Sequence, residues 1–295
     1  MHSKLIQSLL ISGFISMGHL SCSDATDSRL KVTLGTQAAP NQYPAVALLK
    51  KDSSNAYYVY CSGVLLDTQH VLTAAHCSVD FDFNIHNASE VRVSVGEIYP
   101  SRPDSNVASV SAIRIHPKFS KQGMMKDARG LVVPGEAHDI AVWKLADPIE
   151  SFQSQVLRLA SPEDLQAGTT PTLVGYGLRD PWATGSEPIL TQARSLFKDT
   201  FNVSVNQKVL VNGRWITKKV DYVIDSKTSQ EFFLGGPGMP DTCGGDSGGP
   251  VFVEDEQGLL LVGLTSRGIS TCDKGGIYTF VPTYKDWIDS TLATF

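Results

Sequence analysis

The feature that most limits the possible folds is a succession of short apolar segments separated by polar, glycine-rich turns, which begins at Lys31. Residues 91–95 alternate with the period of two that is typical of a half-buried strand. Residues 110–115 are rich in β-forming side chains, and residues 259–264 are almost continuously apolar. No strand–helix–strand rhythm accompanies these segments, which disfavours a parallel sheet. The pattern predicts an all-β fold built as barrels or a sandwich.

Three segments depart from this rhythm. Residues 282–293 predict a C-terminal α-helix, because apolar side chains recur on one helical face after Pro282. Residues 118–137 and 178–240 are expected to be loops and elaborations on a compact scaffold. Within the second of these, residues 206–219 alternate around an Asn-Gly pair, which favours a tight turn, and they predict a β-hairpin.

The N-terminus is typical of an export signal. Basic residues precede the apolar residues 5–17, a run too short and too interrupted by serines for a membrane-spanning helix. Small residues up to Ala25 predict cleavage after that residue, so residues 1–25 are interpreted as a signal peptide of a secreted or periplasmic protein. The alternative is lipidation of Cys22, which would attach the protein to a membrane.

Charge and cysteine content narrow the function classes. The formal net charge is -5 and no basic stripe is visible, so nucleic acid is not an expected partner. If Cys22 leaves with the signal, the other four cysteines can form two disulfides in an oxidising compartment. They form no Cys-x-x-Cys pair and lie in no His-rich cluster, so neither a metal ion nor a cofactor is expected.

A serine surrounded by glycines is the strongest functional signal. Ser247 lies in residues 241–250, where four glycines allow backbone N–H groups to approach a reacting oxygen. A glycine-rich turn and the nucleophile elbow of α/β-hydrolases both fit this segment alone. The elbow requires a histidine after the serine, whereas the last histidine here is His138. The order His76, Asp139, Ser247 instead matches a different serine-hydrolase triad.

Together these residues and their surroundings resemble the trypsin-like serine proteases. The similar segments are Gly35-Thr36 with Pro44, Thr73-Ala74-Ala75-His76-Cys77, Asp139-Ile140-Ala141, Gly175-Tyr176-Gly177, residues 241–250 and residues 284–288. The resemblance implies two six-stranded antiparallel β-barrels around an active-site cleft. They would occupy about residues 32–150 and 151–281 of a protease domain spanning residues 32–295, with the helix at residues 282–293.

The resemblance also implies catalytic roles. Ser247 would attack the scissile carbonyl, His76 would act as general base and then general acid, and Asp139 would orient the imidazole. Gly245 and Ser247 would donate backbone N–H groups to the oxyanion. The expected activity is that of a secreted, monomeric serine endopeptidase that forms an acyl-enzyme with protein or peptide substrates. A non-catalytic binding protein on the same fold and a secreted esterase are the alternatives.

Two disulfides and a specificity pocket follow from the same resemblance. Cys61 would pair with Cys77 near the base, and Cys243 with Cys272 across the pocket. Asp241, six residues before Ser247, would form the pocket floor, with small residues at Gly268 and Gly276 in its walls. A carboxylate in such a pocket favours a cationic partner, which predicts cleavage after Arg or Lys.

The segment Ser266-Arg267-Gly268 departs from the family pattern, which has an aromatic residue between the serine and the glycine. A guanidinium at Arg267 is expected to line the pocket entrance, where it would favour acidic substrate residues or repel basic ones. Residues 118–137 are expected to overhang the same subsites. Both features predict a narrow substrate range.

Activation by cleavage is the last implication of the resemblance. A protease acting after Lys31 would remove residues 26–31 and free the amino group of Val32 to pair with Asp246, since a buried charge requires a partner. The segment Val32-Thr33-Leu34-Gly35 differs from the family's usual Ile-Val-Gly-Gly at this end.

Overall fold

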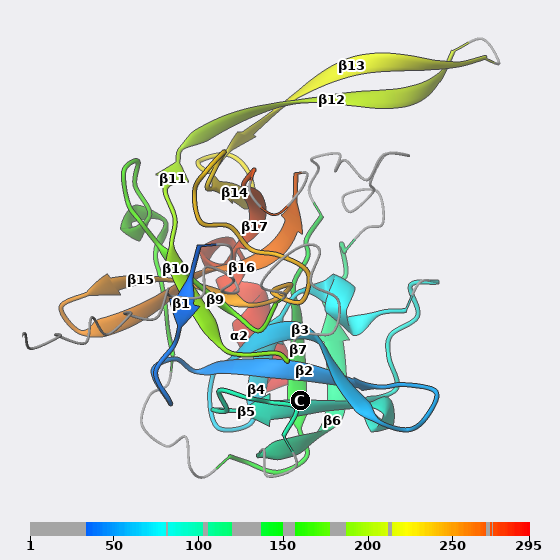
Figure 1. Ribbon diagram of the computed structural model, residues 1–295, viewed down its shortest axis with the longest axis vertical. Coiled ribbons are helices and arrows are strands. Elements are labelled where there is room, and N and C mark those ends of the chain that lie inside the picture. Colours follow the sequence, from blue (N-terminus) through cyan, green and yellow to red (C-terminus); the bar gives the residue numbers. More distant parts are fainter. Residues whose placement is uncertain are drawn as a thin grey trace, which may run out of the picture.

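The computed structural model describes most of the chain from Leu34 onward. The described residues are 34–80, 82–102, 106–119, 137–149, 157–177, 187–211, 214–269, 272 and 274–295. Two β-sheet bodies lie against each other, and a hairpin projects from the second (Figure 1).

The first body is a closed barrel of six antiparallel strands, in the order β2-β3-β4-β7-β6-β5. In β5 the first residues follow the predicted alternation: Val91 and Val93 are fully buried and Arg92 between them is only partly buried. Strand β2 is buried at consecutive residues from Ala45 to Leu49. Trp143 of β7 is completely buried in the barrel interior. The strands are β2 (Ala45–Lys51), β3 (Tyr57–Leu65), β4 (His70–Thr73), β5 (Val91–Val95), β6 (Val107–Ile115) and β7 (Ala141–Leu145).

The second body is a curled sheet of nine strands, whose main path runs β1-β10-β9-β15-β16-β17-β14-β11, with β8 beside β16. The prediction of an all-β fold is confirmed, and this sheet stands where a second six-stranded barrel was expected. Its strands are β1 (Thr36–Gln37), β8 (Arg158–Leu159), β9 (Thr172–Gly175), β10 (Thr191–Arg194), β11 (Phe197–Lys198), β14 (Glu231–Leu234), β15 (Pro250–Asp255), β16 (Gly258–Gly268) and β17 (Gly276–Phe280).

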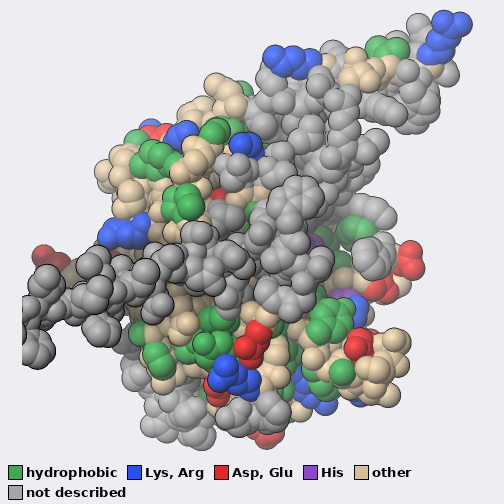
Figure 2. Space-filling view, in the orientation of Figure 1, with side chains coloured by type: hydrophobic (Ala, Val, Ile, Leu, Met, Phe, Trp, Pro, Cys, Tyr) green, Lys and Arg blue, Asp and Glu red, His purple; other side chains and the backbone are tan. Residues whose placement is uncertain are grey.

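A long hairpin extends from the second body. Its strands β12 (Thr200–Val211) and β13 (Arg214–Asp225) pair along their whole length, so the predicted hairpin is confirmed and is longer than residues 206–219. At its base, Phe201 stacks on Phe233 of β14 with ring centroids 3.5 Å apart. Figure 2 shows basic side chains along its projecting end, a part of the molecule in which Arg214 is exposed.

In the part of the chain that the structure describes, helical structure is limited to short segments and the C-terminal helix. The 3₁₀ segments are η1 (Ala75–Ser78), η2 (Ala88–Glu90), η4 (Pro162–Asp164) and η5 (Val281–Tyr284), and η5 leads into α2 (Lys285–Ala293). The expected C-terminal helix is therefore present, with its first turn in the 3₁₀ form. Among the described residues, no helix is long and apolar enough to cross a membrane.

A shared core joins the two bodies and positions the site. Leu72 and Val142 of the barrel belong to the same buried cluster as Phe252 and Leu264 of the second sheet and Ile288 of α2. The segments that carry His76, Asp139 and Ser247 adjoin β4, β7 and β15, three strands that border this core. Burial of these strands therefore determines where the three side chains meet.

Candidate active site

The imidazole of His76 is presented by η1, directly after barrel strand β4. The segment is anchored to the barrel, because Ala75 and Cys77 are buried and Cys77 forms a disulfide with Cys61 of β3. Trp143 adds a further contact, because its indole Nε1 donates a hydrogen bond of 2.8 Å to Ser78 Oγ. Few conformations remain for the ring, which is the arrangement a positioned base needs.

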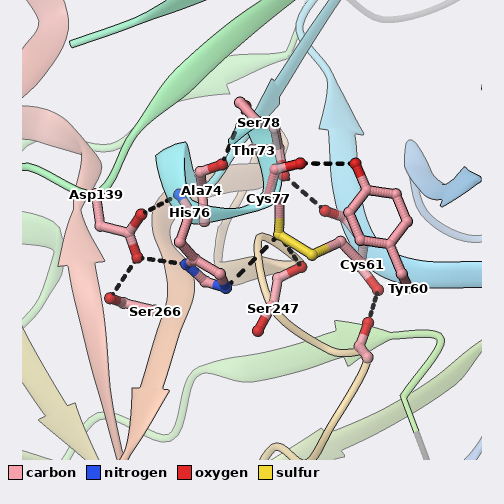
Figure 3. Close-up of a disulfide and its surroundings, with 12 residues drawn as sticks. Tyr60, Cys61, Thr73, Ala74, His76, Cys77, Ser78, Asp139, Ser247 and Ser266 are labelled. Atoms are coloured by element: carbon pink, nitrogen blue, oxygen red, sulfur yellow. Dashed lines mark hydrogen bonds and ion pairs between the residues drawn. A yellow bond between two sulfur atoms is a disulfide. The ribbon is translucent and has the colours of Figure 1, made fainter. Parts of the chain in front are cut away.

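Asp139 is the acid that holds this ring (Figure 3). Its Oδ1 accepts the backbone N–H of His76 at 2.9 Å, and its Oδ2 lies 2.8 Å from His76 Nδ1. Ser266 Oγ donates a third hydrogen bond, of 2.7 Å, to Oδ2. Burial alone would raise the pKa of Asp139, but the charge of His76 and these hydrogen bonds outweigh it and hold the pKa below its usual value. An ionised Asp139 that accepts from Nδ1–H leaves His76 Nε2 available as a proton acceptor.

Ser247 lies beside the ring, in the glycine-rich segment before β15 (Figure 3). Its carbonyl accepts the N–H of Ser62 at 2.7 Å, and the next residue, Gly248, donates to Thr265 O at 2.7 Å. Gly248 has φ +77°, and a Cβ there would lie 2.1 Å from Thr73 Oγ1, so only glycine fits this close approach. These backbone contacts hold the serine segment between β3 and β16.

His76 and Ser247 are neighbours in the site (Figure 3), and no direct hydrogen bond between them is found in the described part of the chain. His76 Nε2 is 3.7 Å from Cys77 Sγ, and within the described residues no hydrogen bond joins Nε2 to Ser247 Oγ. Catalytic hydrogen bonds are often loose in free enzymes and tighten when substrate binds. The described geometry therefore contains a formed Asp139–His76 pair, with the Ser247 segment beside it.

Gly245 lies in a tight turn next to a surface hollow. Its φ is +95°, and a Cβ there would lie 3.0 Å from Gly177 Cα, so the turn requires glycine. Ser62 Oγ donates to Gly245 O at 2.9 Å and accepts the N–H of Tyr176 at 3.0 Å. The hollow of about 610 Å³ beside it is lined by Gly244 and Gly245, by Tyr57 to Tyr60, and by Ser101, Tyr176, Gly177, Glu187 and Pro188.

Asp241 is a buried carboxyl, with a side chain that is 1% exposed. Its Oδ2 accepts the N–H of Gly275 at 2.9 Å and its Oδ1 accepts the N–H of Thr242 at 2.8 Å. Burial raises the pKa of Asp241 to about 7, against the effect of these hydrogen bonds. A Cβ on Gly276 would lie 3.3 Å from Asp241 Oδ1, and Gly276 pairs with Gly268 across β16 and β17. The two glycines and Asp241 are therefore brought together.

Asp246 is completely buried on the other side of the serine segment. Its Oδ1 accepts the N–H of Gly177 at 2.7 Å, and its Oδ2 accepts the N–H of Cys243 at 2.9 Å. Lys31 and Val32, the residues expected to supply its charged partner after cleavage, lie outside the described residues. Leu34, at the start of the described chain, has φ +65°, a left-handed conformation that favours glycine.

Arg267 lies elsewhere than expected. Its side chain is turned inward and almost fully buried, with Nη1 2.6 Å from Glu231 Oε1 and Nη2 2.7 Å from Glu231 Oε2. The expectation of a guanidinium charge lining the pocket entrance is therefore wrong. The physical reason is that the planar guanidinium matches both oxygens of a buried carboxylate, which otherwise lacks a strong donor pair.

The two implied disulfides, Cys61–Cys77 and Cys243–Cys272, are both present. The first places Cys61, Cys77 and His76 within 4.8 Å of one another. Such a cluster resembles a metal site by distance alone. Its two sulfur atoms are bonded to each other, however, and it is the thiolate that binds metal ions.

Comparison with known proteins identifies the family. The trypsin family model matches residues 32–288. The chain belongs to the trypsin family. Relatives include mouse (Mus musculus) chymotrypsin-C, 30% identical over 92% of this chain and 94% of its own length. Phenoloxidase-activating factor 1 of Holotrichia diomphalia is 28% identical over 89% of this chain and 70% of its own length. Mouse kallikrein 1-related peptidase b3 is 29% identical over 79% of this chain and 80% of its own length.

As a trypsin-family chain, this protein has the scaffold of a serine protease. Its two disulfides are typical of proteins that fold in oxidising compartments. Sequence reasoning did not find two residues that support the site, Ser62 and Glu231. Both are polar residues at fully or nearly buried positions of otherwise apolar strand segments. That signal could have marked them, because a buried polar group requires a partner.

Proposed function

We propose that this chain is a serine endopeptidase in which Ser247 is the nucleophile, His76 the general base and acid, and Asp139 the group that orients His76. The observation that carries the proposal is the Asp139 carboxylate, which accepts both the backbone N–H and the Nδ1–H of His76. This double contact sets the tautomer that leaves Nε2 facing outward as a base.

The reaction would proceed through an acyl-enzyme. Ser247 Oγ attacks the scissile carbonyl carbon while its proton passes to His76 Nε2, and the backbone N–H groups of Gly245 and Ser247 stabilise the oxyanion. His76 then gives this proton to the leaving amine as the C–N bond breaks. A water molecule, deprotonated by His76, releases the acyl group, and the proton returns to Ser247 Oγ. Asp139 stays ionised throughout and stabilises the imidazolium.

Cleavage after Arg or Lys is the specificity that Asp241 supports. Its buried carboxyl lies beside Gly276, which pairs with Gly268, and burial raises its pKa to about 7. A substrate cation would favour the ionised carboxylate, and this gain is larger in a dry pocket than in water. Small residues at Gly268 and Gly276 would leave room for a long side chain.

Export and activation complete the proposal. Residues 1–25 would direct export, and cleavage after Lys31 by an activating protease would release the Val32 amino group to pair with Asp246. Phenoloxidase-activating factor 1 carries activation of another protein in its name. A role as one step of a proteolytic cascade, with a protein or peptide substrate, is the corresponding proposal for this chain, which would act as a monomer.

Labelling with a fluorophosphonate tests the proposed function. The chain cleaved after Lys31 should be labelled, Ser247→Ala should not, and Ser54→Ala, at an exposed turn serine, should react like the unmodified chain. Absence of labelling in the cleaved chain would favour a non-catalytic binding protein. Labelled protein that hydrolyses simple esters and leaves peptides intact would favour an esterase. Edman sequencing of active material should begin at Val32.

A further inference from the structure

The buried ion pair between Arg267 and Glu231 is the feature of this site that the proposed mechanism does not use. Arg267 belongs to β16 and Glu231 to β14, and their side chains are 3% and 7% exposed. Glu231 also accepts the backbone N–H of Ala137, two residues before Asp139. Burial raises the pKa of Glu231, and the charge and hydrogen bonds of Arg267 oppose that shift. The two residues thus form a buried ion pair close to Asp139.

A chain of hydrogen bonds connects this pair to Asp139. Arg267 Nη1 donates to Ser266 Oγ at 3.1 Å, and Ser266 Oγ donates to Asp139 Oδ2 at 2.7 Å. A guanidinium can only donate, and an ionised carboxylate can only accept. Ser266 Oγ, which has one proton, therefore accepts from Arg267 and must direct that proton to Asp139.

We infer that Arg267, fixed in place by Glu231, is a positioning residue that acts on the catalytic pair through the hydroxyl of Ser266. This inference rests on the proposed function for its catalytic meaning. The guanidinium occupies a lone pair of Ser266 Oγ and polarises its O–H bond, which makes the hydroxyl a better and better-directed donor. Asp139 Oδ2, which accepts from both Ser266 Oγ and His76 Nδ1, then shares its charge between these two donors. The two ends of the relay lie in different bodies, since Arg267 comes from the curled sheet and His76 from the barrel.

The charges around this relay limit what its removal can do. Among the described residues, the charged groups that act on Asp139 and Glu231 are His76, Arg267 and, for Glu231, the carboxylate of Asp139. Removing Arg267 and Glu231 together leaves the net charge unchanged. An apolar pair of similar size often replaces a buried ion pair without loss of stability. An effect on His76 that disappears when Ser266 has already been replaced then reports the lost hydrogen bond to Ser266.

A mutant cycle tests the relay. The variants are Ser266→Ala, the pair Arg267→Met with Glu231→Met, and the triple combination. Two readouts are followed: the NMR resonance of the His76 Nδ1 proton and the pH profile of fluorophosphonate labelling. With a weaker donor from Ser266, Asp139 should accept more strongly from Nδ1–H, so its resonance should move downfield. The acid limb of labelling should move to higher pH by ~0.5 unit in both Ser266→Ala and the pair variant.

The triple variant decides between a relay and a separate structural effect. If Arg267 acts through Ser266, the triple variant should match Ser266→Ala in both readouts. Additive shifts, or a pair variant identical to the unmodified chain, would overturn the inference. Near-UV circular dichroism checks folding, and a version with leucine at both positions serves if the methionine pair fails to fold. The control is Arg158→Met with Asp255→Met, which removes an exposed bidentate pair of the second sheet and should leave both readouts unchanged.

The NMR readout requires no turnover, so the inference and the proposed function can fail separately. Unlabelled Ser247 with a shifted Nδ1 resonance in the pair variant would contradict the endopeptidase and support the relay. Labelled Ser247 with an unchanged Nδ1 resonance in the pair variant would support the endopeptidase and contradict the relay. With a peptide substrate, the pair variant should lose about fivefold in kcat with KM within twofold, because the relay acts on the proton transfer and not on substrate binding.

Discussion

The backbone of Gly177 lies directly against the carboxylate of Asp246. Its N–H donates to Asp246 Oδ1 at 2.7 Å, and a Cβ on Gly177 would lie 2.4 Å from Asp246 Cγ. Asp246 is the residue before Ser247 and is completely buried. The absence of a side chain at Gly177 therefore allows the serine segment to occupy its position.

Gly177→Ala is expected to reduce the free energy of unfolding by about 3 kcal/mol, because the added methyl group must displace a buried carboxylate. Labelling of Ser247 should also slow, since its neighbour moves. Urea unfolding measures the first effect. Gly168→Ala is the control: it has φ +89° and no atom within 4 Å of the added Cβ, so it carries only backbone strain of about 1 kcal/mol. Equal losses in the two variants would contradict the steric argument.

Asp241 is expected to make binding of a cationic ligand depend on pH. Its pKa of about 7 means that the carboxyl is mostly neutral at pH 6 and mostly ionised at pH 8. Benzamidine, a cation at both pH values, should therefore bind about tenfold more tightly at pH 8. Calorimetric titration measures this ratio. In Asp241→Asn, binding should be weak at both pH values, and a ratio near one in the unmodified chain would contradict a carboxylate floor.

Much of this architecture was predictable from local patterns. The period-two alternation of residues 91–95 and the apolar run at residues 259–264 led to β5 and to part of β16, because burial of one or both strand faces leaves that imprint. His76, Asp139 and Ser247 were proposed from their order in the chain together with the family-like segments around them. The geometry then showed Asp139 and His76 in direct contact.

What could not be predicted depends on pairings between distant strands. Arg267 and Glu231 are 36 residues apart in the chain, and nothing local to Arg267 indicates that β14 will present a carboxylate beneath it. For that reason Arg267, which stands where the family usually has an aromatic residue, was expected to place its charge at the pocket entrance. The order of strands in the second sheet is of the same kind, since the pairing of β1 with β10 joins segments far apart in sequence.

His116 is expected to weaken the fold in acid. Its ring stacks on His138 with centroids 4.9 Å apart and meets Trp287 edge-on. Burial, the neighbouring His138 and the charge of Lys118 lower the pKa of His116 to about 4. The unfolded chain, with an ordinary histidine pKa near 6.5, then binds more protons than the folded chain between about pH 4 and 6.5. The stability contributed by the neutral ring is present above this window and is lost as the pH falls through it.

Replacing that ring should remove this dependence. In His116→Phe, the fall of the urea midpoint between pH 6.5 and 4 should be smaller than in the unmodified chain, because phenylalanine keeps the stack without a titrating group. Asp241 acts with the opposite sign, since its raised pKa makes stability fall as the pH rises toward 7. Adding Asp241→Asn to both chains separates the two effects. Parallel curves for the unmodified chain and His116→Phe would contradict the assignment.

Loss of the Cys243–Cys272 disulfide is expected to affect the binding of a cationic ligand more than the hydrogen bond between His76 and Asp139. It joins the segment before Ser247 to the segment that leads to Gly275, whose N–H bonds to Asp241, so it would connect two sides of the proposed specificity pocket. Closing a loop with a sequence separation of 29 stabilises a fold by about 3 kcal/mol. Cys243→Ala with Cys272→Ala should lose that stability and weaken benzamidine binding severalfold, with the His76 Nδ1 resonance unchanged. Cys61→Ala with Cys77→Ala is the matched comparison, because its disulfide adjoins His76. That variant should move the Nδ1 resonance and leave benzamidine binding nearly intact, and the same profile in both variants would contradict a separate role for each disulfide.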